Sequence, residues 1–171
     1  MNKNKFSNKY SDWSFEAVIE ISAGSSAKFE IDRSGNFRLD RYLGASLTYP
    51  FAYGFIPQTL SGDSDALDVL VLTDKKLKPK QKIIVKPIGV LKMKDEHGGD
   101  DKIITVLKND SGVWGEVNDI NDLSWAWCEK IDLFFRHYKE FAGKRWSRVI
   151  GFGDLKEAKK ITTLAIDRLK Q

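Results

Sequence analysis

Residues 49–74, YPFAYGFIPQTLSGDSDALDVLVLTD, place three aspartates on one short turn and follow them at once with an apolar run. The aspartates are Asp63, Asp65 and Asp68, and residues 69–72 have the composition of a buried strand. Like charges this close repel, and burying them without a partner costs several kcal/mol. A divalent cation removes that cost, and carboxylate oxygens suit Mg²⁺ or Mn²⁺. The stretch therefore predicts a metal site beside a buried strand.

Two other interpretations of this acidic turn stay open. A solvated turn between two strands has the same composition and binds nothing. A calcium loop of the helix-loop-helix kind fits less well, because that pattern requires an oxygen ligand at its fifth position and glycine at its sixth. This chain has Leu67 and Asp68 there.

Length and composition are typical of one globular domain. The chain has 171 residues, of which 42% are hydrophobic and 30% are charged. Its single cysteine, Cys128, excludes an internal disulfide and fits a reducing cytoplasm. No apolar run approaches the roughly 20 residues of a membrane span. A net charge of +4 does not by itself indicate nucleic-acid binding. We expect residues 1–12 to form a polar N-terminal arm.

The first two thirds of the chain has the short alternating or apolar stretches that are typical of strands. The strands are expected over residues 13–21, 28–32, 37–43, 68–73, 83–93 and 103–107. In the first of them every second residue from Trp13 to Ile21 is apolar, which predicts a strand with one buried face. Gly54 indicates a close approach of two backbones, and Gly89 a bulge.

Two helices are expected near the end of the chain. Residues 123–138 have helical periodicity, with Asn121 or Asp122 as the N-cap and Gly143 as the end. Residues 146–150 are expected to form one more strand. Asp154 and Glu157 form a capping-box pattern for a last helix. Its buried side is expected to comprise Leu155, Ala158, Ile161, Ala165 and Leu169.

A second acidic turn, Asp95, Glu96, Asp100 and Asp101, also follows an apolar strand. Either turn can face solvent, but two such clusters are also what a site with several metals requires. Two-metal sites hold their ions roughly 3.5–4 Å apart and activate a bridging water. The sequence therefore favours the two turns coming together.

Cationic and aromatic candidates are scattered along the chain. Taken singly, each cation is more often a solvated charge and each tyrosine a core side chain. The candidates are Lys28, Arg41, Lys102, Lys139, Tyr49, Tyr53 and Tyr138.

Five other residues are read as structural. His97 and His137 have no spacing that pairs them as metal ligands, so we expect surface or turn positions. Cys128 is expected to pack on a helix, and Trp125 and Trp127 to be core and interface side chains.

Eight motifs occur in order from about residue 13 to the end of the chain. They are Glu20-Ile-Ser-Ala, Lys28-Phe-Glu30-Ile-Asp, Asp40-Arg41-Tyr, Tyr49-Pro-Phe-Ala-Tyr53-Gly-Phe-Ile-Pro, Asp63-Ser-Asp65-Ala-Leu-Asp68-Val, Gly89-Val-Leu-Lys-Met-Lys-Asp95-Glu96, Asp100-Asp-Lys102 and His137-Tyr138-Lys139. Together they resemble the soluble inorganic pyrophosphatases of the barrel type (family I), in their short bacterial form. The chain departs from that pattern at Ser22, Gly24 and Ala66, and none of these departures removes a charge that the resemblance places against metal or phosphate.

The resemblance implies an α+β fold: a small five-stranded OB-like closed β-barrel with flanking strands and two main helices packed against it. It implies a single catalytic domain over residues 13–171, which hydrolyses Mg-pyrophosphate to two phosphates by direct attack of a metal-activated water. Several Mg²⁺ ions would bind in each site, with Mn²⁺ or another divalent ion as alternatives. It also implies a cytoplasmic homohexamer with no nucleic-acid or membrane partner.

The resemblance also carries roles for individual residues. The implied metal ligands are Asp63, Asp68, Asp95, Asp100 and Glu30, supported by Glu20 and Glu96. The implied catalytic residues are Asp65, which accepts the proton of the attacking water, with Arg41, Lys28 and Tyr53. The implied substrate-binding residues are Lys28, Arg41, Tyr49, Tyr53, Lys102, Tyr138 and Lys139.

Two rival functions follow from the same residues. Small barrels often bind oligonucleotides through basic and aromatic side chains, although two carboxylate clusters would repel such a polyanion. A metal-dependent hydrolase acting on another phosphate ester or a nucleotide is the third hypothesis. The chain lacks a G-x-x-x-x-G-K-[ST] phosphate loop. A substrate panel separates the three.

Overall fold

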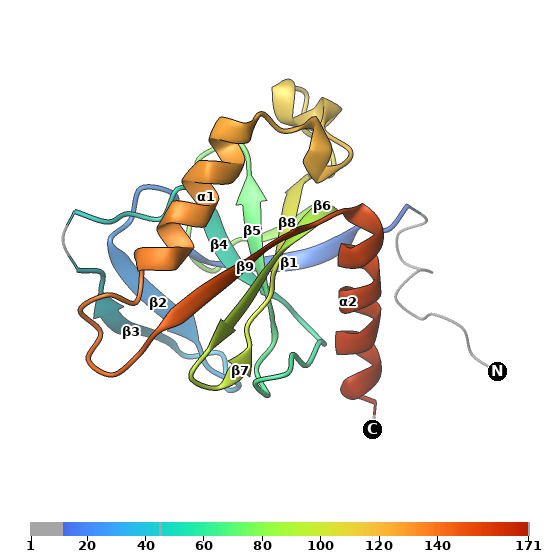
Figure 1. Cartoon of the computed structure of the whole chain (residues 1–171). Coiled ribbons are helices and arrows are strands. Elements are labelled where there is room, and N and C mark those ends of the chain that lie inside the picture. Colours follow the sequence, from blue (N-terminus) through green and yellow to red (C-terminus); the bar gives the residue numbers. More distant parts are fainter. Residues whose placement is uncertain (1–11, 45, 171) are drawn as a thin grey trace.

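The computed structural model describes residues 12–44 and 46–170. These residues form a mostly β structure with helices packed against it (Figure 1). Its strands are β1 (Phe15–Ile21), β2 (Ala27–Ile31), β3 (Phe37–Tyr42), β4 (Ala52–Ile56), β5 (Leu67–Leu72), β6 (Lys82–Asp95), β7 (Gly98–Gly99), β8 (Lys102–Leu107) and β9 (Ser147–Gly153). Its helices are η1 (Val113–Glu116), η2 (Ile120–Asp122), α1 (Trp125–His137) and α2 (Leu155–Arg168). The N-terminal arm expected over residues 1–12 lies outside the described residues except for Asp12.

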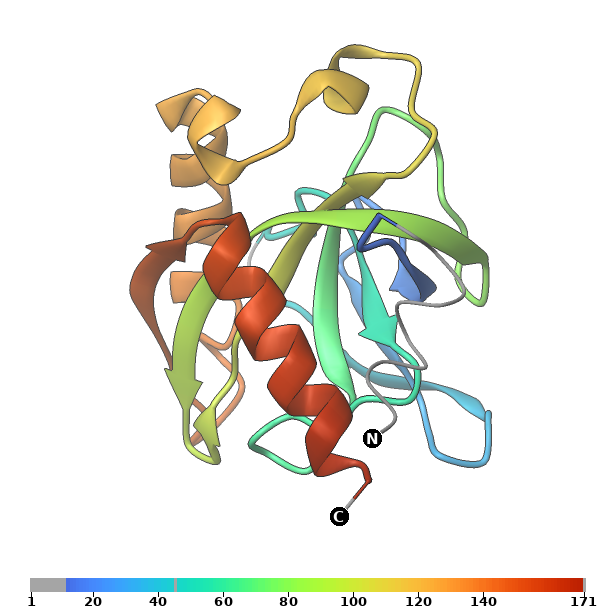
Figure 2. The same ribbon diagram turned by 90° about the vertical axis from the view of Figure 1, so that its right-hand side faces the viewer.

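Strand pairing closes into a ring. β1 pairs with β4, β4 with β5, β5 with β8, β8 with β6, and β6 with β1 again. β7 and β9 pair with β6, while β2 and β3 form a separate hairpin. Helix α1 packs on β9 and α2 on β6, so the helices cover different parts of the sheet; Figure 2 shows α2 lying obliquely in front of the strands.

Strand β5 is buried on both faces, which explains its unbroken apolar run. Val69 and Val71 point into the core that α2 covers. Leu70 and Leu72 point into the core that α1 covers. Because strand side chains alternate, Asp68 lies on the same face as Leu70, at the edge of the α1 core. The strand thus fixes the direction of the Asp68 carboxylate near its start.

Both glycine predictions are confirmed. A Cβ on Gly54 would lie 1.9 Å from the Val18 carbonyl oxygen, so β4 approaches β1 more closely than any side chain permits. The register between β6 and β8 shifts between Pro87 and Gly89, as expected for a bulge.

The prediction for the first strand is wrong in two respects. Trp13 lies outside β1, has a positive φ of 60° and is 40% exposed. Val18 and Glu20, which alternate with the apolar residues and so point to the opposite face, are buried too. β1 is therefore buried on both faces. The reason is that β1 belongs to the ring, where neighbouring elements cover both sides of it.

The expected boundaries of α1 also need correction. Ser124 is the N-cap of α1, and Asp122 instead accepts the backbone N–H of Asp119 and so caps η2. The helix ends at His137, well before Gly143. For α2 the Asp154 cap is confirmed, since its side chain accepts the backbone N–H of Glu157.

Three apolar side chains depart from their expected burial. Trp125 and Trp127, expected to be core and interface side chains, are 75% and 37% exposed on α1, and Leu169, just past the end of α2, is 50% exposed. Within residues 12–44 and 46–170, no helix has the length and apolar composition needed to cross a bilayer.

Candidate active site

A buried ammonium lies at the centre of the candidate site. Asp68 of β5 and Lys102 of β8 are direct partners in the parallel pairing, so their side chains lie on one face. The Lys102 Nζ donates to Asp68 Oδ2 at 2.5 Å and to Asp100 Oδ1. Lys102 is 1% exposed. Burial alone would lower the pKa of Lys102, but the charges of Asp68 and Asp100 raise it well above its ordinary value. Lys102 is therefore a permanent cation between two carboxylates.

Three buried tyrosines border this ammonium. The Tyr138 Oη donates to Asp100 Oδ2 at 3.5 Å, and the Lys102 Nζ lies 5.8 Å from the Tyr53 ring centroid. Tyr49 packs against Tyr53 with 5.3 Å between ring centroids. The Tyr49 Oη is buried without a hydrogen-bond partner among the described residues. Burial raises the pKa of Tyr49 and Tyr53 well above the ordinary value, so both hydroxyls are neutral donors.

A second pair of opposite charges lies at the end of β6. The Lys139 Nζ donates to Asp95 Oδ2 at 2.6 Å and lies 3.6 Å from Glu96 Oε2. Asp95 Oδ1 accepts the backbone N–H of His97. Burial alone would raise the pKa of Asp95, but the hydrogen bonds from Lys139 and His97 lower it below its ordinary value. Asp95 is consequently ionised at neutral pH.

The β2–β3 hairpin supplies the other two predicted cations. The Lys28 Nζ contacts Glu30, and it lies 3.1 Å from Asp40 Oδ2. The Arg41 Nη1 donates to the same Asp40 oxygen at 2.5 Å, while Arg41 Nη2 is buried without a partner among the described residues. Tyr49 Oη and Arg41 Nη2 are thus two shielded donors with no acceptor in the described chain.

The acidic turn that opens β5 is organised by its own backbone. Asp63 Oδ1 accepts the backbone N–H of Asp65, a local turn that short acidic side chains favour. Arg33 from the hairpin donates to the Ser64 carbonyl oxygen at 2.9 Å, which ties the two loops together. Partial burial and the charges of Asp63 and Asp68 raise the pKa of Asp65 above its ordinary value. Asp65 is therefore a better proton acceptor than an isolated aspartate.

Glu20 of β1 is hydrogen-bonded to the β2–β3 hairpin. Its Oε1 accepts the backbone N–H of Ile31 at 2.7 Å. Burial raises the pKa of Glu20 to about 7, and the charges of Asp68 and Glu30 act in the same direction. Those charges indicate that β1, the hairpin and the acidic turn lie around one site.

The raised pKa of Glu20 predicts a pH dependence of stability in chelator-treated protein. The folded state holds this proton up to about pH 7, whereas an unfolded glutamate loses it near pH 4.5. Stability is thus fully present below pH 4.5 and decreases by about 3 kcal/mol as the pH rises through 7. Urea unfolding at several pH values measures this slope. Glu20→Gln should remove it, whereas Glu16→Gln, on the more exposed part of β1, should keep it. Equal slopes in the two variants would contradict the assignment.

The structure does not gather every predicted carboxylate. Asp101 alternates away from Asp100 and accepts the backbone N–H of Met93, so the second acidic turn splits between two faces. Glu30 is largely exposed and touches Lys28. Among residues 12–44 and 46–170, no three Asp, Glu, His or Cys side chains stand close enough together to hold an ion. The paired carboxylates Asp68 and Asp100 converge instead on an ammonium.

The donor set nevertheless fits a hard divalent cation. The converging ligands are all carboxylate oxygens, as Mg²⁺ and Mn²⁺ prefer, with no sulfur or imidazole among them. Asp68 and Asp100 already lie around one positive charge, and Asp95 lies next to another. A metal at this place would replace an ammonium as their counterion.

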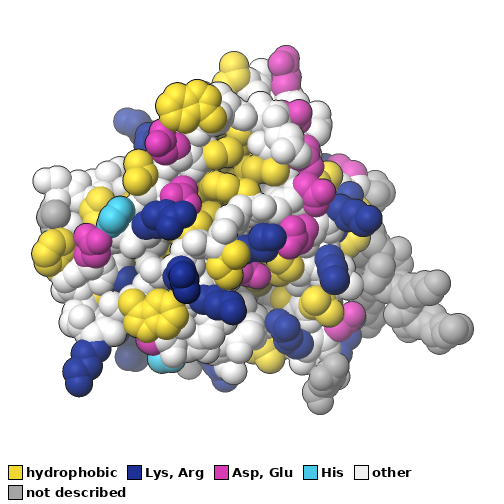
Figure 3. All heavy atoms as spheres, viewed as in Figure 1, with side chains coloured by type: hydrophobic (Ala, Val, Ile, Leu, Met, Phe, Trp, Pro, Cys, Tyr) yellow, Lys and Arg dark blue, Asp and Glu magenta, His cyan; other side chains and the backbone are white. Residues whose placement is uncertain are grey.

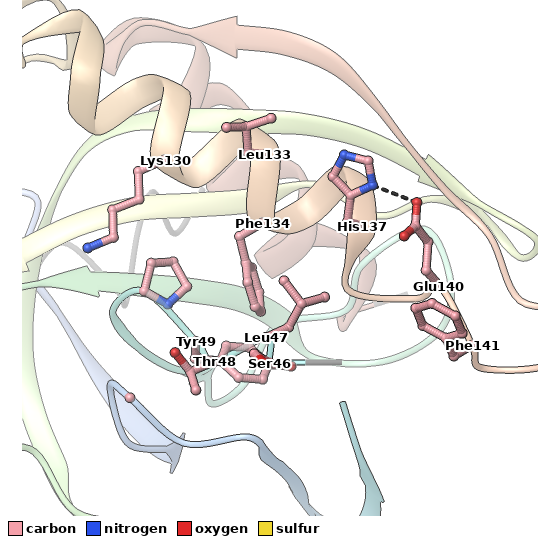
Figure 4. A pocket seen from close by; sticks show the side chains of 12 residues that line it. Ser46, Leu47, Thr48, Tyr49, Lys130, Leu133, Phe134, His137, Glu140 and Phe141 are labelled. Atoms are coloured by element: carbon pink, nitrogen blue, oxygen red, sulfur yellow. Dashed lines mark hydrogen bonds and ion pairs between the residues drawn. The ribbon is translucent and has the colours of Figure 1, made fainter. Parts of the chain in front are cut away.

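A hollow of about 690 Å³ opens beside this cluster, between α1 and residues 46–50 (Figure 4). Its lining includes Leu47, Leu133 and Phe134, and Figure 4 shows His137 and Glu140 paired at its edge, 2.5 Å apart. Of the predicted site residues it shares only Tyr49. A mostly apolar lining does not match a highly charged ligand. His137 and His97 are exposed, as expected.

Two charged side chains at this site had no predicted role. Asp40 accepts from Lys28 and Arg41, and Arg145 lies 3.5 Å from it. Asp40 stood next to a predicted cation in the Asp40-Arg41-Tyr motif, which was a usable signal. Arg145 comes from a segment that no motif covered.

Comparison with known proteins gives a consistent result. Residues 17–170 match the Pyrophosphatase family, described as inorganic pyrophosphatase. An inorganic pyrophosphatase of Sulfolobus acidocaldarius is 46% identical over 89% of this chain and 89% of its own length. One of Corynebacterium glutamicum is 42% identical over 92% of this chain and 99% of its own. The solved structure of a Thermus thermophilus inorganic pyrophosphatase matches with a TM-score of 0.90 at 38% identity, covering 95% of this chain and 94% of its own. A Helicobacter pylori inorganic pyrophosphatase gives 0.89 at 38%, covering 92% and 94%.

Proposed function

This chain belongs to the inorganic pyrophosphatase family and hydrolyses pyrophosphate to phosphate, and on that premise we propose that the reaction takes place around Lys102, between the β2–β3 hairpin, the acidic turn and Lys139. The observation that carries this placement is the pair of buried donors, Arg41 Nη2 and Tyr49 Oη, that lack an acceptor. Buried hydrogen-bond donors nearly always have an acceptor. Two such donors without one in the described chain therefore support a ligand here that brings acceptor oxygens, as an anion does.

The predicted cofactor is Mg²⁺, held by Asp63, Asp68, Asp95 and Asp100, with Glu30 nearby. When bound, it would supply positive charge to the phosphate oxygens and lower the pKa of the attacking water. Mn²⁺ is the alternative, because the same oxygen ligands suit it.

The chain's own residues divide the remaining work. Asp65 takes the water proton, supported by its raised pKa, as the new P–O bond forms and the bridging P–O bond breaks. Arg41 and Lys28 hold phosphate oxygens; the planar fork of arginine suits two oxygens at once. Lys139 and Tyr138 hold the other phosphate. Phosphoryl transfer needs little covalent work from the protein, so positioning and charge dominate.

The wider organisation is proposed on the same premise. The five-stranded ring is taken as the OB-like closed barrel, and residues 13–171 as one catalytic domain. A homohexamer and a cytoplasmic location are expected from the family resemblance, and sedimentation velocity tests the first. Nucleic acid is not an expected partner: on the face shown in Figure 3, basic and acidic side chains are mixed and form no single basic field.

Phosphate release tests the proposal directly. Pyrophosphate, ATP and a phosphomonoester are each offered with Mg²⁺, with Mn²⁺ and with a chelator. We expect fast release from pyrophosphate that depends on the metal, and little from the other two. Comparable release from ATP or the monoester would favour a broader phosphohydrolase. No release from folded, metal-supplied protein would favour a binding module.

Replacing Arg41 by alanine should lower turnover far more than metal affinity. Loss of a preorganised cation on the reacting phosphate costs roughly 10²–10³-fold in kcat. Mg²⁺ affinity, measured by calorimetry without substrate, should change by less than about threefold, because Arg41 contacts Asp40 and none of the proposed ligands.

The control for this variant is Arg38→Ala, which removes an exposed arginine from the same strand, β3, and should leave both values unchanged. A larger loss in metal affinity than in turnover for Arg41→Ala would make Arg41 a structural residue.

A further inference from the structure

One carboxylate oxygen at the edge of the site is shared by three cations. Asp40 Oδ2 lies 2.5 Å from Arg41 Nη1, 3.1 Å from Lys28 Nζ and 3.5 Å from Arg145 Nη1. These cations come from β3, β2 and the segment between α1 and β9. The proposed reaction gives Asp40 no role, although it touches Lys28 and Arg41, two of the cations proposed to hold phosphate.

A bulge in the hairpin explains how Asp40 reaches both cations. Lys28 pairs with Arg41 and the next residue, Phe29, pairs with Leu39, so Asp40 is the extra residue on β3. Adjacent strand residues ordinarily point to opposite faces. A bulge breaks that alternation and re-aims a side chain. Here it lets Asp40 and Arg41 meet.

The contacts are shielded enough to fix the side chains. The side chains of Lys28, Arg41 and Asp40 are 18%, 16% and 20% exposed. Burial alone would raise the pKa of Asp40, but the charges of Lys28, Arg41 and Arg145 lower it below its ordinary value. Asp40 is therefore an anion throughout the neutral range, and the Arg41 guanidinium has only one of its ends engaged.

We propose that Asp40 is the positioning residue of the phosphate-binding cations: it fixes Arg41 through Nη1, so that Nη2 is aimed at the substrate, and it holds the Lys28 ammonium beside it. The free Nη2 is the observation that gives the bond its function, because Arg41 is held through one nitrogen and leaves a second, buried nitrogen available to a ligand, whereas arginine–carboxylate pairs frequently use two nitrogens. This inference rests on the proposed pyrophosphate hydrolysis.

Arg145 extends the same contact to another part of the site. It is half-exposed and belongs to the segment that follows Tyr138 and Lys139. Asp40 thus joins the hairpin to the segment that holds the other phosphate. At 3.5 Å this contact is looser than the other two, so it contributes less to alignment.

The test separates two possible roles of Asp40: orienting the phosphate-binding cations, or only adjusting the net charge of the site. Neutralising Asp40 leaves the site more positive, which favours capture of an anion, but it frees Arg41 to move and leaves Lys28 held by Glu30 alone. Asp40→Asn should therefore lower kcat roughly 10- to 100-fold while the KM for pyrophosphate stays equal or falls. If Asp40 only adjusted the charge, KM would fall and kcat would stay the same, which would overturn the proposal.

The matched control is Asp132→Asn, which also removes a 2.5 Å ion pair with an arginine and has a similarly shielded carboxylate. It should keep both constants, and thermal unfolding should give both variants similar midpoints. Equal kinetics for the two variants would overturn the inference while leaving the proposed function intact. Wild-type protein without pyrophosphate hydrolysis would overturn both.

Two more variants keep the result decisive if Asp40→Asn folds poorly. Asp40→Glu retains the charge but displaces the carboxylate, so its kcat should fall severalfold; a wild-type kcat would contradict positioning. Arg145→Gln should lose less kcat than Asp40→Asn. An equal loss would mean that Asp40 acts through Arg145 rather than through Lys28 and Arg41.

Discussion

Replacement of Asp65 by asparagine is expected to lower pyrophosphate turnover by roughly 10²–10⁴-fold, the range for loss of a general base. The side chain keeps its shape, and the Asp63 carboxylate still accepts the backbone N–H of residue 65, so the turn should persist. Asparagine cannot take the water proton at any pH. The wild-type pKa of Asp65 is raised by partial burial and by Asp63 and Asp68, which makes it a stronger base than a solvated carboxylate.

Steady-state phosphate release measures this loss, and calorimetric Mg²⁺ titration measures metal binding. Metal affinity should change little, since Asp65 is not among the proposed ligands. Asp74→Asn is the control, because Asp74 is an exposed carboxylate at the opposite end of β5. Near-normal activity in Asp65→Asn would remove the residue from the base role. Equal losses in the two variants would point to a general charge effect.

Replacing Lys102 by methionine is expected to have the largest effect on stability. The substitution keeps the volume but leaves Asp68 and Asp100 without their shared counterion. Removing one partner of a buried ion pair typically costs about 3–5 kcal/mol. Because the Asp68 side chain is 26% exposed, we expect the lower part of that range in metal-free protein.

Urea unfolding with a chelator and with Mg²⁺ measures this effect. Lys92→Met is the control, since Lys92 forms a more exposed ion pair with Glu157 at 3.0 Å, which is worth at most about 1 kcal/mol. Mg²⁺ should stabilise Lys102→Met more than the wild type, because the freed carboxylates bind the ion without displacing an ammonium. The idea fails if the two variants lose equal stability, or if Mg²⁺ stabilises Lys102→Met no more than the wild type.

Local features of the site were predictable wherever a single strand or turn decides them. The three aspartates before an apolar run place Asp68 on one face of a doubly buried strand, and Gly54 marks the contact with β1. Asp100 and Asp101 precede β8, and only the structure shows that Asp100 contacts Lys102 while Asp101 accepts the backbone N–H of Met93. Residue type alone therefore predicts one acidic cluster where the structure has two differently directed groups.

Other features depended on pairing between strands far apart in the chain. The sequence does not distinguish Lys102 from the other candidate cations. The parallel register of β5 and β8 places it beside Asp68. Asp40 became the centre of three cations only through a register shift in the hairpin. Ser124 replaced the expected caps of α1, since Asp119 and Asp122 cap η2. For Lys102 and Asp40 the strand pairing decides the outcome, whereas the change of cap at α1 is local to η2.

By itself the sequence determined which groups the site contains: carboxylates, cations and tyrosines on strand ends and turns, ordered as in the inorganic pyrophosphatases. Tertiary structure alone decided which charge neutralises which, namely Lys102 for Asp68 and Asp100, Lys139 for Asp95, and Asp40 for Lys28 and Arg41. The physical reason is that charge interactions fall with distance and strengthen with burial. Both distance and burial are set by strand register and packing rather than by position along the chain.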